Sequence, residues 1–138
     1  LEAMKQIIKM QYYITACSND AMQYAVLEAM NEAADYPDLI AKEFKERCDL
    51  IVDRLNSMPG VECHKPKGAI YVFPKVKVDG FNSEELALEI LKDGVLCSPG
   101  SAFGPSGEGH LRFAYTISKE EISRGMDKLE QTLKRLNC

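Results

Sequence analysis

The 138-residue sequence lacks the residue groupings that common metal centres and thiol enzymes need. It has only two histidines, and none of its five cysteines forms a pair separated by two residues. The patterns of zinc ribbons and thioredoxin-like redox sites are therefore missing, and no metal site is expected. Cys63 adjoins His64, but neighbouring residues of a strand point to opposite faces, so no catalytic pair is expected. We expect reduced thiols, as in a cytoplasmic protein.

Long apolar runs and clusters of basic residues are also missing. No segment has the length and apolar character of a membrane-spanning helix, and no signal peptide is found. The formal net charge is −4 without a dense lysine or arginine run, so no nucleic-acid partner is expected. Hydrophobic residues make up 46% of the sequence, which is enough for a packed core. Because Leu1 already lies within a helical apolar pattern, we expect a piece of a longer protein.

Residues 1–58 have the pattern of successive helices. Apolar residues recur at helical spacing from Leu1 to Ile8. Ser18-Asn19-Asp20 then supplies cap-type residues before a helix rich in small residues. A longer helix follows, with Pro37 in its first turn, and it ends before Pro59-Gly60.

Residues 60–138 alternate short strands with helices. The predicted strands are residues 61–64, 69–73, 95–97 and 111–115, and helices follow the capping residues Asn82 and Ser118. The expected buried faces of these helices are Leu86, Ala87, Ile90 and Leu91 in the first, and Ile122, Met126, Leu129, Leu133 and Leu136 in the last. This order predicts an α+β fold in which a helical segment precedes a small mixed or antiparallel sheet covered by helices.

The segment between the last two predicted strands is rich in glycine. Gly100, Gly104, Gly107 and Gly109 lie within ten residues, and glycine allows a backbone to fold closely around a ligand. The segment is not a Walker loop, because no Gly-Lys-Ser/Thr follows, and its spacing differs from a dinucleotide-binding fingerprint. The residues themselves leave open a functional loop or a surface connection.

Arg112 lies in the strand that follows this loop. By the alternation of a strand it shares a face with Ala114 and opposes Leu111 and Phe113. Two interpretations remain open: an arginine on the exposed face of a sheet, or a guanidinium group presented beside the loop to bind a carboxylate. The planar fork of arginine suits a carboxylate better than the amine of lysine does.

Two neighbouring segments carry a resemblance to a known family. They are Ser98-Pro99-Gly100-Ser101-Ala102-Phe103-Gly104 and Gly107-Glu108-Gly109-His110-Leu111-Arg112-Phe113-Ala114-Tyr115. Together they resemble the closing signature of class I/II aminotransferases, which have fold type I. The resemblance implies that Arg112 binds the substrate α-carboxylate. It also implies an active-site loop that includes Gly100, Ser101, Phe103 and Gly104.

The resemblance extends in order along the sequence and implies a domain organisation. Residues 1–35 correspond to a helical segment at the end of the family's large domain. Residues 36–138 correspond to the C-terminal small α+β domain, including the long connecting helix. Ser18 and Asn19 resemble the segment that reaches the partner subunit's active site, which implies a homodimer for the full-length protein.

The family that the sequence resembles holds pyridoxal 5'-phosphate through a lysine in a Ser-Lys segment. The only Ser-Lys here is Ser118-Lys119, at the start of a helix. We therefore expect the cofactor lysine to be missing, and this segment to hold no cofactor and to be inactive alone. The full-length protein is expected to transfer an amino group between an amino acid, such as aspartate, and a 2-oxo acid, such as 2-oxoglutarate.

Other functions remain open at this point. An aminotransferase-like lyase or synthase has the same fold, and a non-catalytic ligand-sensing domain of a regulator does too. An upstream Ser-Lys motif would favour the enzyme, and an N-terminal helix-turn-helix would favour the regulator. Near the loop, Phe103 is interpreted as a substrate-side residue or a loop anchor. Glu108 is expected to be solvated, and His110 to be a strand residue rather than a base.

Overall fold

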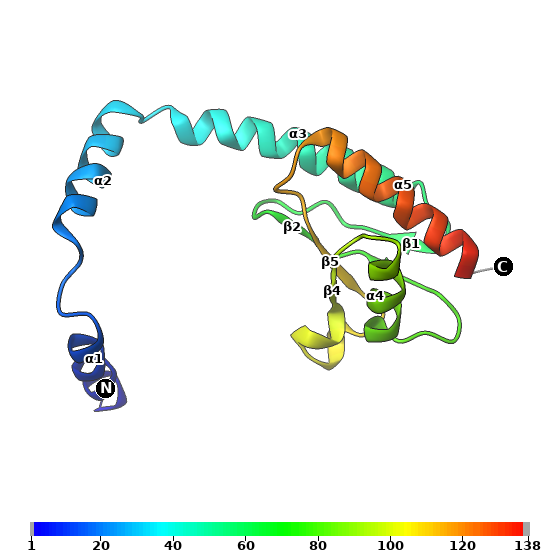
Figure 1. The fold of residues 1–138 in the computed structure, drawn as a ribbon, viewed down its shortest axis with the longest axis horizontal. Helices are drawn as coiled ribbons and strands as arrows, with labels where there is room; N and C mark the ends of the chain where they lie inside the picture. The colour runs from blue at the N-terminus through cyan, green and yellow to red at the C-terminus, as the bar shows by residue number, and fades with distance from the viewer. Residues whose placement is uncertain (1, 137–138) are drawn as a thin grey trace. The chain divides into compact units, whose positions relative to one another are not determined.

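The computed structural model describes residues 2–136 and divides the chain into two compact units, Leu1–Leu39 and Ile40–Cys138 (Figure 1). The division falls within helix α3 (Tyr36–Asn56). The resemblance implies a domain boundary between residues 35 and 36, and that boundary stays a prediction.

Helices α1 (Glu2–Ile14) and α2 (Asp20–Glu32) belong to the first unit, and neither helix buries a side chain. The helix expected after the cap-type residues is present. The side chain of Asn19 caps it by accepting a hydrogen bond from the backbone N–H of Met22 (3.2 Å). Large apolar side chains are exposed on both helices: Met4, Ile7, Ile8, Met10, Tyr12, Tyr13, Ile14, Met22, Tyr24, Val26, Leu27 and Met30. Such a surface is typical of helices that pack against another part of a protein.

The second unit contains two small antiparallel sheets. Strand β1 (Val61–Glu62) pairs with β3 (Lys75–Val76). Strand β5 (Leu111–Ala114) is central in the other sheet, between β2 (Tyr71–Val72) and β4 (Ser98–Pro99).

Helices α3, α4 (Ser83–Lys92) and α5 (Lys119–Leu136) surround these sheets. Helices α3 and α5 lie side by side (Figure 1), and Arg54 of α3 forms an ion pair with Asp127 of α5 (2.6 Å). The predicted α+β fold is thus confirmed, and its sheets are antiparallel.

Residues 95–97 do not form the expected strand. The backbone N–H of Val95 donates to the carbonyl of Ile90 (3.3 Å), at the end of helix α4, and strand pairing begins only at Ser98. Val95 is buried, but Leu96 is 80% exposed. Of these two side chains, only that of Val95 is therefore enclosed. Its backbone N–H bonds to the end of helix α4 instead of to a neighbouring strand.

The strand expected at residues 69–73 is reduced to β2, and the following strand β3 was not expected. Ala69 has a φ of 66°, outside the extended region, so the strand cannot begin there. The buried hydroxyl of Tyr115 donates a hydrogen bond to the carbonyl of Ala69 (2.7 Å). This contact with β5's end holds the unusual backbone conformation in place.

One apolar core joins the sheets and helices of the second unit. Its most enclosed apolar side chains are Ile51, Leu55, Val72, Ile90, Leu111 and Leu129. The expected buried residues of α4 and α5 are confirmed for Leu86, Ala87, Ile90, Ile122, Met126, Leu129 and Leu133, and Leu136 is partly buried. Leu91 was also expected to be buried, but it is 47% exposed. It lies one residue after Ile90 and is therefore turned about 100° around the helix, away from the core.

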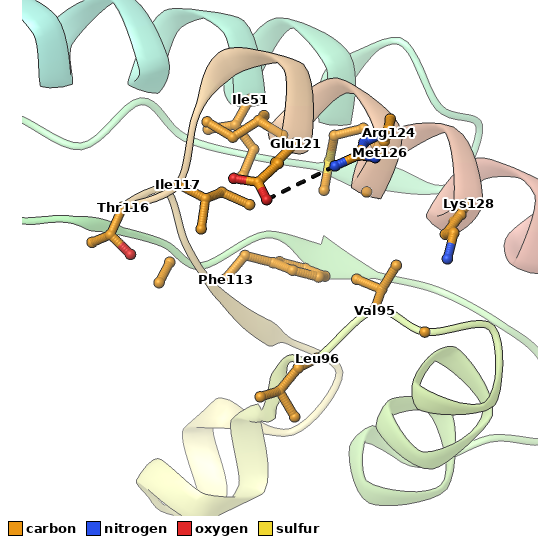
Figure 2. Close-up of a pocket in the computed structure, with 14 residues that line it drawn as sticks. Ile51, Val95, Leu96, Phe113, Thr116, Ile117, Glu121, Arg124, Met126 and Lys128 are labelled. Atoms are coloured by element: carbon orange, nitrogen blue, oxygen red, sulfur yellow. Dashed lines mark ion pairs between the residues drawn. The ribbon is translucent and has the colours of Figure 1, made fainter.

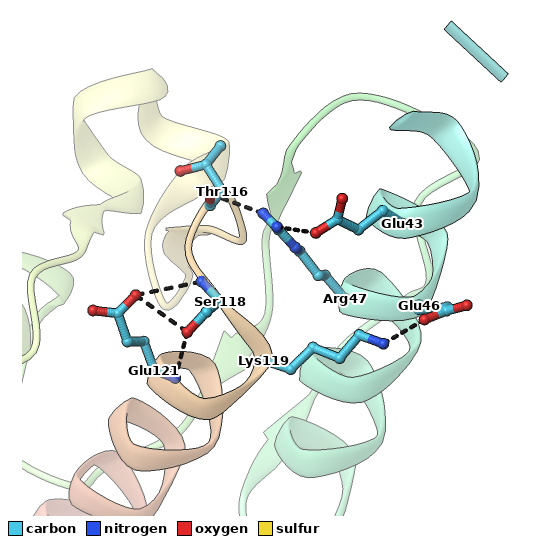
Figure 3. A network of polar contacts seen from close by, with 7 residues as sticks. All are labelled: Glu43, Glu46, Arg47, Thr116, Ser118, Lys119 and Glu121. Carbon is cyan, nitrogen blue, oxygen red and sulfur yellow. Dashed lines mark hydrogen bonds and ion pairs between the residues drawn. The ribbon is translucent and has the colours of Figure 1, made fainter. Parts of the chain in front are cut away.

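Both expected capping boxes are present. At α4, the side chain of Asn82 and the carboxylate of Glu85 accept hydrogen bonds from each other's backbone N–H groups (2.9 and 3.2 Å). At α5, the hydroxyl of Ser118 accepts from the N–H of Glu121 (3.2 Å), whose carboxylate accepts from the N–H of Ser118 (3.4 Å) (Figure 3).

Polar contacts also attach the start of α5 to α3 (Figure 3). Arg47 donates a hydrogen bond to the carbonyl of Thr116 (2.9 Å), and Lys119 forms an ion pair with Glu46. The hydrogen bond and the charge of Lys119 lower the pKa of the Glu46 carboxyl.

Leu88 and Ile90 offer a matched test of this core. Both lie on α4, but Ile90 is 0% exposed and Leu88 is 60% exposed. Ile90→Ala is expected to lower the free energy of unfolding by about 2–5 kcal/mol, because it leaves a cavity. Leu88→Ala is expected to change it by less than about 1 kcal/mol. Denaturant titration followed by circular dichroism measures both, and equal losses would contradict the described core.

Candidate functional site

The loop between β4 and β5 folds into two turns of 3₁₀-helix, η1 (Gly100–Phe103) and η2 (Pro105–Gly107). Its backbone packs closely on itself. A Cβ atom on Gly100 would lie 2.0 Å from the carbonyl oxygen of Gly107, so no side chain fits there. Gly104 joins the two turns with a φ of 109°, which also favours glycine. The loop is therefore a defined structure, held by contacts between its own ends.

Glu108 attaches this loop to the N-terminus of helix α4. Its carboxylate accepts hydrogen bonds from the backbone N–H of Ser83 (2.7 Å), the hydroxyl of Ser83 (2.9 Å) and the N–H of Gly109 (3.0 Å). The Ser83 hydroxyl in turn accepts one from the N–H of Ser101 (3.2 Å). These bonds, above all that from the Ser83 backbone, lower the pKa of the Glu108 carboxyl. Glu108 is exposed, as expected, and its carboxylate also attaches the loop to helix α4.

Arg112 lies half-buried on the open face of β5, as the strand alternation predicted. Leu111 and Phe113 are buried on the opposite face. Ser98 lies directly across from Arg112 on β4, and its hydroxyl accepts a hydrogen bond from the guanidinium Nη2 (3.3 Å). The strand pairing therefore presents Arg112 beside the start of the glycine loop.

Two aromatic rings lie against the guanidinium group of Arg112. Its Cζ atom is 4.5 Å from the ring centre of Tyr71 and 4.4 Å from that of Phe103. Phe103 also contacts Phe73 edge to face (5.9 Å, 87°), and Phe73 stacks on His110 (5.0 Å, 8°). Rings attract the cation and orient it, but they do not neutralise its charge.

Arg112 is the one arginine in residues 2–136 whose guanidinium group forms no ion pair. The other arginines pair with carboxylates: Arg47 with Glu43, Arg54 with Asp127 and Glu130, Arg124 with Glu121, and Arg135 with Asp93 and Glu89. A partly desolvated charge without a counterion is unfavourable, and a bound anion relieves this. A carboxylate suits the site best, because it can accept two parallel hydrogen bonds from the planar fork.

The structure brings together part of the predicted site. Phe103 contacts Arg112 directly, and Gly100, Ser101 and Gly104 shape the loop that carries Phe103. Ser18 and Asn19 lie in the other unit, where Asn19 caps α2, and their contact with a partner subunit stays a prediction.

Four residues near Arg112 and the loop were not predicted as site residues: Tyr71, Phe73, Ser83 and Ser98. Alternation along the predicted strand places Tyr71 and Phe73 on the same face. This was the one feature of the sequence that could have indicated both residues. Ser83 and Ser98 gave no local signal, because their partners lie 25 and 14 residues further along the chain.

Thiol and metal chemistry find no support in residues 2–136. Burial raises the pKa of the Cys63 thiol to about 11, and that of Cys97 to about 11, so both are protonated at neutral pH. Cys17 and Cys48 are also free thiols, whereas Cys138 lies outside the described residues. No cluster of histidine, cysteine, aspartate and glutamate within this range has the make-up of a metal site.

None of the helices within residues 2–136 combines the length and apolar character that crossing a membrane requires.

A separate hollow of about 500 Å³ lies beside helix α5 (Figure 2). It is lined mainly by apolar side chains, including Ile51, Leu96 and Phe113, and Phe113 is on the face of β5 opposite Arg112. Glu121 and Arg124 in its lining form an ion pair (3.8 Å). None of Arg112, Tyr71, Phe103 and Ser98 lines this hollow, so it is separate from the arginine site.

The fold and the arginine site define an α+β domain with a half-buried guanidinium group that forms no ion pair within the described residues. No protein-family model matches the sequence. The chain is 37% identical over 127 residues to a probable N-acetyl-LL-diaminopimelate aminotransferase of Bacillus subtilis. The matched region covers 91% of this chain and 32% of that protein. It is 35% identical over 135 residues to an aspartate aminotransferase of Pyrococcus horikoshii, covering 96% of this chain and 34% of that protein.

Solved structures agree with this relationship. An alanine aminotransferase from Pyrococcus furiosus matches with a TM-score of 0.86 and 35% identity, over 95% of this chain and 34% of that one. An aromatic aminotransferase from Pyrococcus horikoshii matches with a TM-score of 0.86 and 34% identity, over 95% and 36%. The chain belongs to the fold-type I aminotransferases and corresponds to their C-terminal part. It spans about one third of the length of the relatives it matches.

The contacts of Glu108 predict a pH-dependent contribution to stability. Because the pKa of Glu108 is lower in the folded state, its ionised carboxylate stabilises the fold at pH values above the ordinary glutamate pKa of 4.5. This stabilisation is lost as the pH falls through the lowered pKa of the folded state. Glu108→Gln is therefore expected to lower Tm near neutral pH, and the difference from the unsubstituted chain is expected to shrink in acid. Melting curves across this pH range measure it.

Glu84→Gln is the matched control, because Glu84 is an exposed residue in the first turn of the same helix. It should leave the pH profile of Tm nearly unchanged. A difference for Glu108→Gln that stays constant down to strongly acidic pH would argue against the carboxylate's role.

Proposed function

We propose that the whole protein is a pyridoxal-phosphate-dependent aminotransferase and that Arg112 binds the α-carboxylate of its substrates. The observation that carries this proposal is the half-buried guanidinium group of Arg112, which contacts rings and a hydroxyl but pairs with no carboxylate of residues 2–136. The relatives support it, because they are named as aminotransferases.

One arginine can serve both halves of such a reaction. The amino acid that gives up its amino group and the 2-oxo acid that receives it each carry a carboxylate next to the reacting carbon. A two-pronged contact with Arg112 fixes this carboxylate and thereby the direction of the reacting carbon. Fixing reactants in this way removes much of the entropic cost of reaction.

The amino donor is the finer part of the proposal. Relatives are named for aspartate, alanine and aromatic amino acids. Since the α-carboxylate is common to all of these, Arg112 does not distinguish between them. We propose aspartate or an aromatic amino acid as the donor and 2-oxoglutarate as the acceptor.

The residues at Arg112 fit a carboxylate rather than the cofactor. Within residues 2–136, the hydrogen-bonding and aromatic groups at the guanidinium of Arg112 are the Ser98 hydroxyl and the rings of Tyr71 and Phe103. This set includes no amine for a covalent bond with pyridoxal 5'-phosphate and no carboxylate to pair with its pyridine nitrogen. The cofactor would supply an electron sink, and we place its binding groups in a part of the whole protein outside this segment.

We also propose a cytoplasmic homodimer for the whole protein. The free thiols support a reducing compartment. The exposed apolar side chains of α1 and α2 support burial of both helices in a larger assembly, since neither helix has a buried residue of its own. Ser18 and Asn19, between these helices, are the proposed contact with the partner subunit's active site.

Substitution of Arg112 tests the proposed function. In the whole protein, Arg112→Ala is expected to lower kcat/KM for the amino acid and the oxo acid, because it removes one side of a desolvated charge pair. Such a loss costs about 2–5 kcal/mol, or roughly 30- to 5,000-fold. Arg112→Lys keeps the charge but not the fork, so it should recover only part of the activity.

Arg124→Ala serves as the control, because Arg124 is an exposed arginine outside the site, and it should keep normal kinetics. Steady-state kinetics and Tm are measured together. Normal kinetics in Arg112→Ala would refute the carboxylate role, and a large fall in its Tm would indicate a structural role instead.

The expectation that this segment holds no cofactor predicts its behaviour when it is alone. When it is mixed with pyridoxal 5'-phosphate and reduced with borohydride, we expect weak labelling spread over several lysines. Pyridoxal without phosphate is the control and should label to a similar extent, because no phosphate site is expected. Peptide mass spectrometry locates the labels. Stoichiometric labelling of a single lysine by the phosphate form would contradict the prediction.

A further inference from the structure

The rings of Tyr71 and Phe103 reach Arg112 from the two sides of its strand. Arg112 lies on the central strand β5, Tyr71 on the neighbouring strand β2, and Phe103 in the turn that directly follows β4 on the other side. The distances from Cζ to the two ring centres are nearly equal, 4.5 and 4.4 Å. The rings therefore flank the guanidinium group, and the Ser98 hydroxyl occupies part of its edge.

Neither ring is needed to fill the core. Tyr71 is 40% exposed and Phe103 is 51% exposed, although both are large aromatic side chains. Their neighbours nevertheless restrict them. Phe103 is held by its edge contact with Phe73 and by the loop's own backbone contact between Gly100 and Gly107.

The loop that carries Phe103 is fixed at a second point. The backbone N–H and the hydroxyl of Ser83 donate hydrogen bonds to the Glu108 carboxylate, and the N–H of Ser101 donates one to the Ser83 hydroxyl, so the loop is attached to the start of helix α4. These bonds hold the loop that places the ring of Phe103 beside Arg112.

We propose that Tyr71 and Phe103 are positioning residues that orient Arg112 before the substrate arrives. This inference rests on the proposed carboxylate-binding role of Arg112. A long arginine side chain loses rotamer freedom when it binds a ligand, and ordering such a side chain costs roughly 2- to 12-fold in affinity. The rings restrict the guanidinium group in advance and cover its faces, so that its remaining N–H edge is left for a planar carboxylate.

The test uses the whole protein and two unreactive carboxylates, propionate and 3-phenylpropionate. These resemble alanine and phenylalanine without the amino group, so they report carboxylate binding by calorimetry without turnover. Tyr71→Leu and Phe103→Leu are each expected to raise Kd by about 2- to 12-fold for both ligands, with Tm unchanged. The values of kcat/KM for alanine and phenylalanine should fall by a similar factor.

Substitutions that keep a ring should restore the contact. Tyr71→Phe and Phe103→Tyr are expected to hold Kd within about 2-fold of the unsubstituted protein, because the cation still meets an aromatic face. Phe81→Leu is the matched control: Phe81 is an exposed phenylalanine (36%) in the loop before α4, and its loss should not change Kd. If a leucine variant does not fold, methionine replaces leucine at that position.

Three results would overturn the inference. An unchanged Kd in both leucine variants would show that the rings do not orient Arg112. A loss confined to 3-phenylpropionate would show that they contact the substrate side chain instead. A weaker Kd accompanied by a lower Tm would show a structural role.

Arg112→Ala, measured beside these variants, separates this inference from the proposed function. If it binds propionate as tightly as the unsubstituted protein, the proposed function fails. If only Arg112→Ala loses affinity, the positioning role fails and the proposed function stands.

Discussion

Burial of one face of strand β5 in the core determines which side chains lie on its other face. Leu111 is 0% exposed and Phe113 is 3% exposed, so both are committed to the core. A shift of the strand by one residue would place Arg112 in the core and these apolar side chains in water. The cost of such a shift fixes the register with β2 and β4, and the register fixes the position of Arg112 beside Tyr71 and Ser98.

The arginine site also shows how an unpaired charge is kept on a folded domain. Surface arginines elsewhere in the described part of the chain lie next to carboxylates, as Arg54 does with Asp127. Around Arg112 the neighbours are rings and a hydroxyl, which favour the cation and leave its hydrogen-bonding edge available. Within residues 2–136 the charge of Arg112 is thus held by rings and a hydroxyl, without a carboxylate partner.

Much of the architecture followed from local signals. Helix positions came from apolar spacing and capping residues, and the capping boxes at Asn82 and Ser118 are confirmed. Short-range geometry governs these features, because a cap joins residues only three apart. The strand expected at residues 95–97 was wrong, since an apolar run satisfies a strand and a helix-end connection equally well. Pairing with a partner decides between them.

The sequence by itself determined the α+β fold, the alternation that exposes Arg112, and the glycines that the loop requires. Only the tertiary structure decided that Glu108 attaches the loop to Ser83, that rings from two different segments flank Arg112, and that Arg112 pairs with no carboxylate in the described part of the chain. The physical reason is the range of the interactions. Alternation and capping act between residues close in sequence, whereas the partner of a charge or a ring is whichever group the packed core brings next to it.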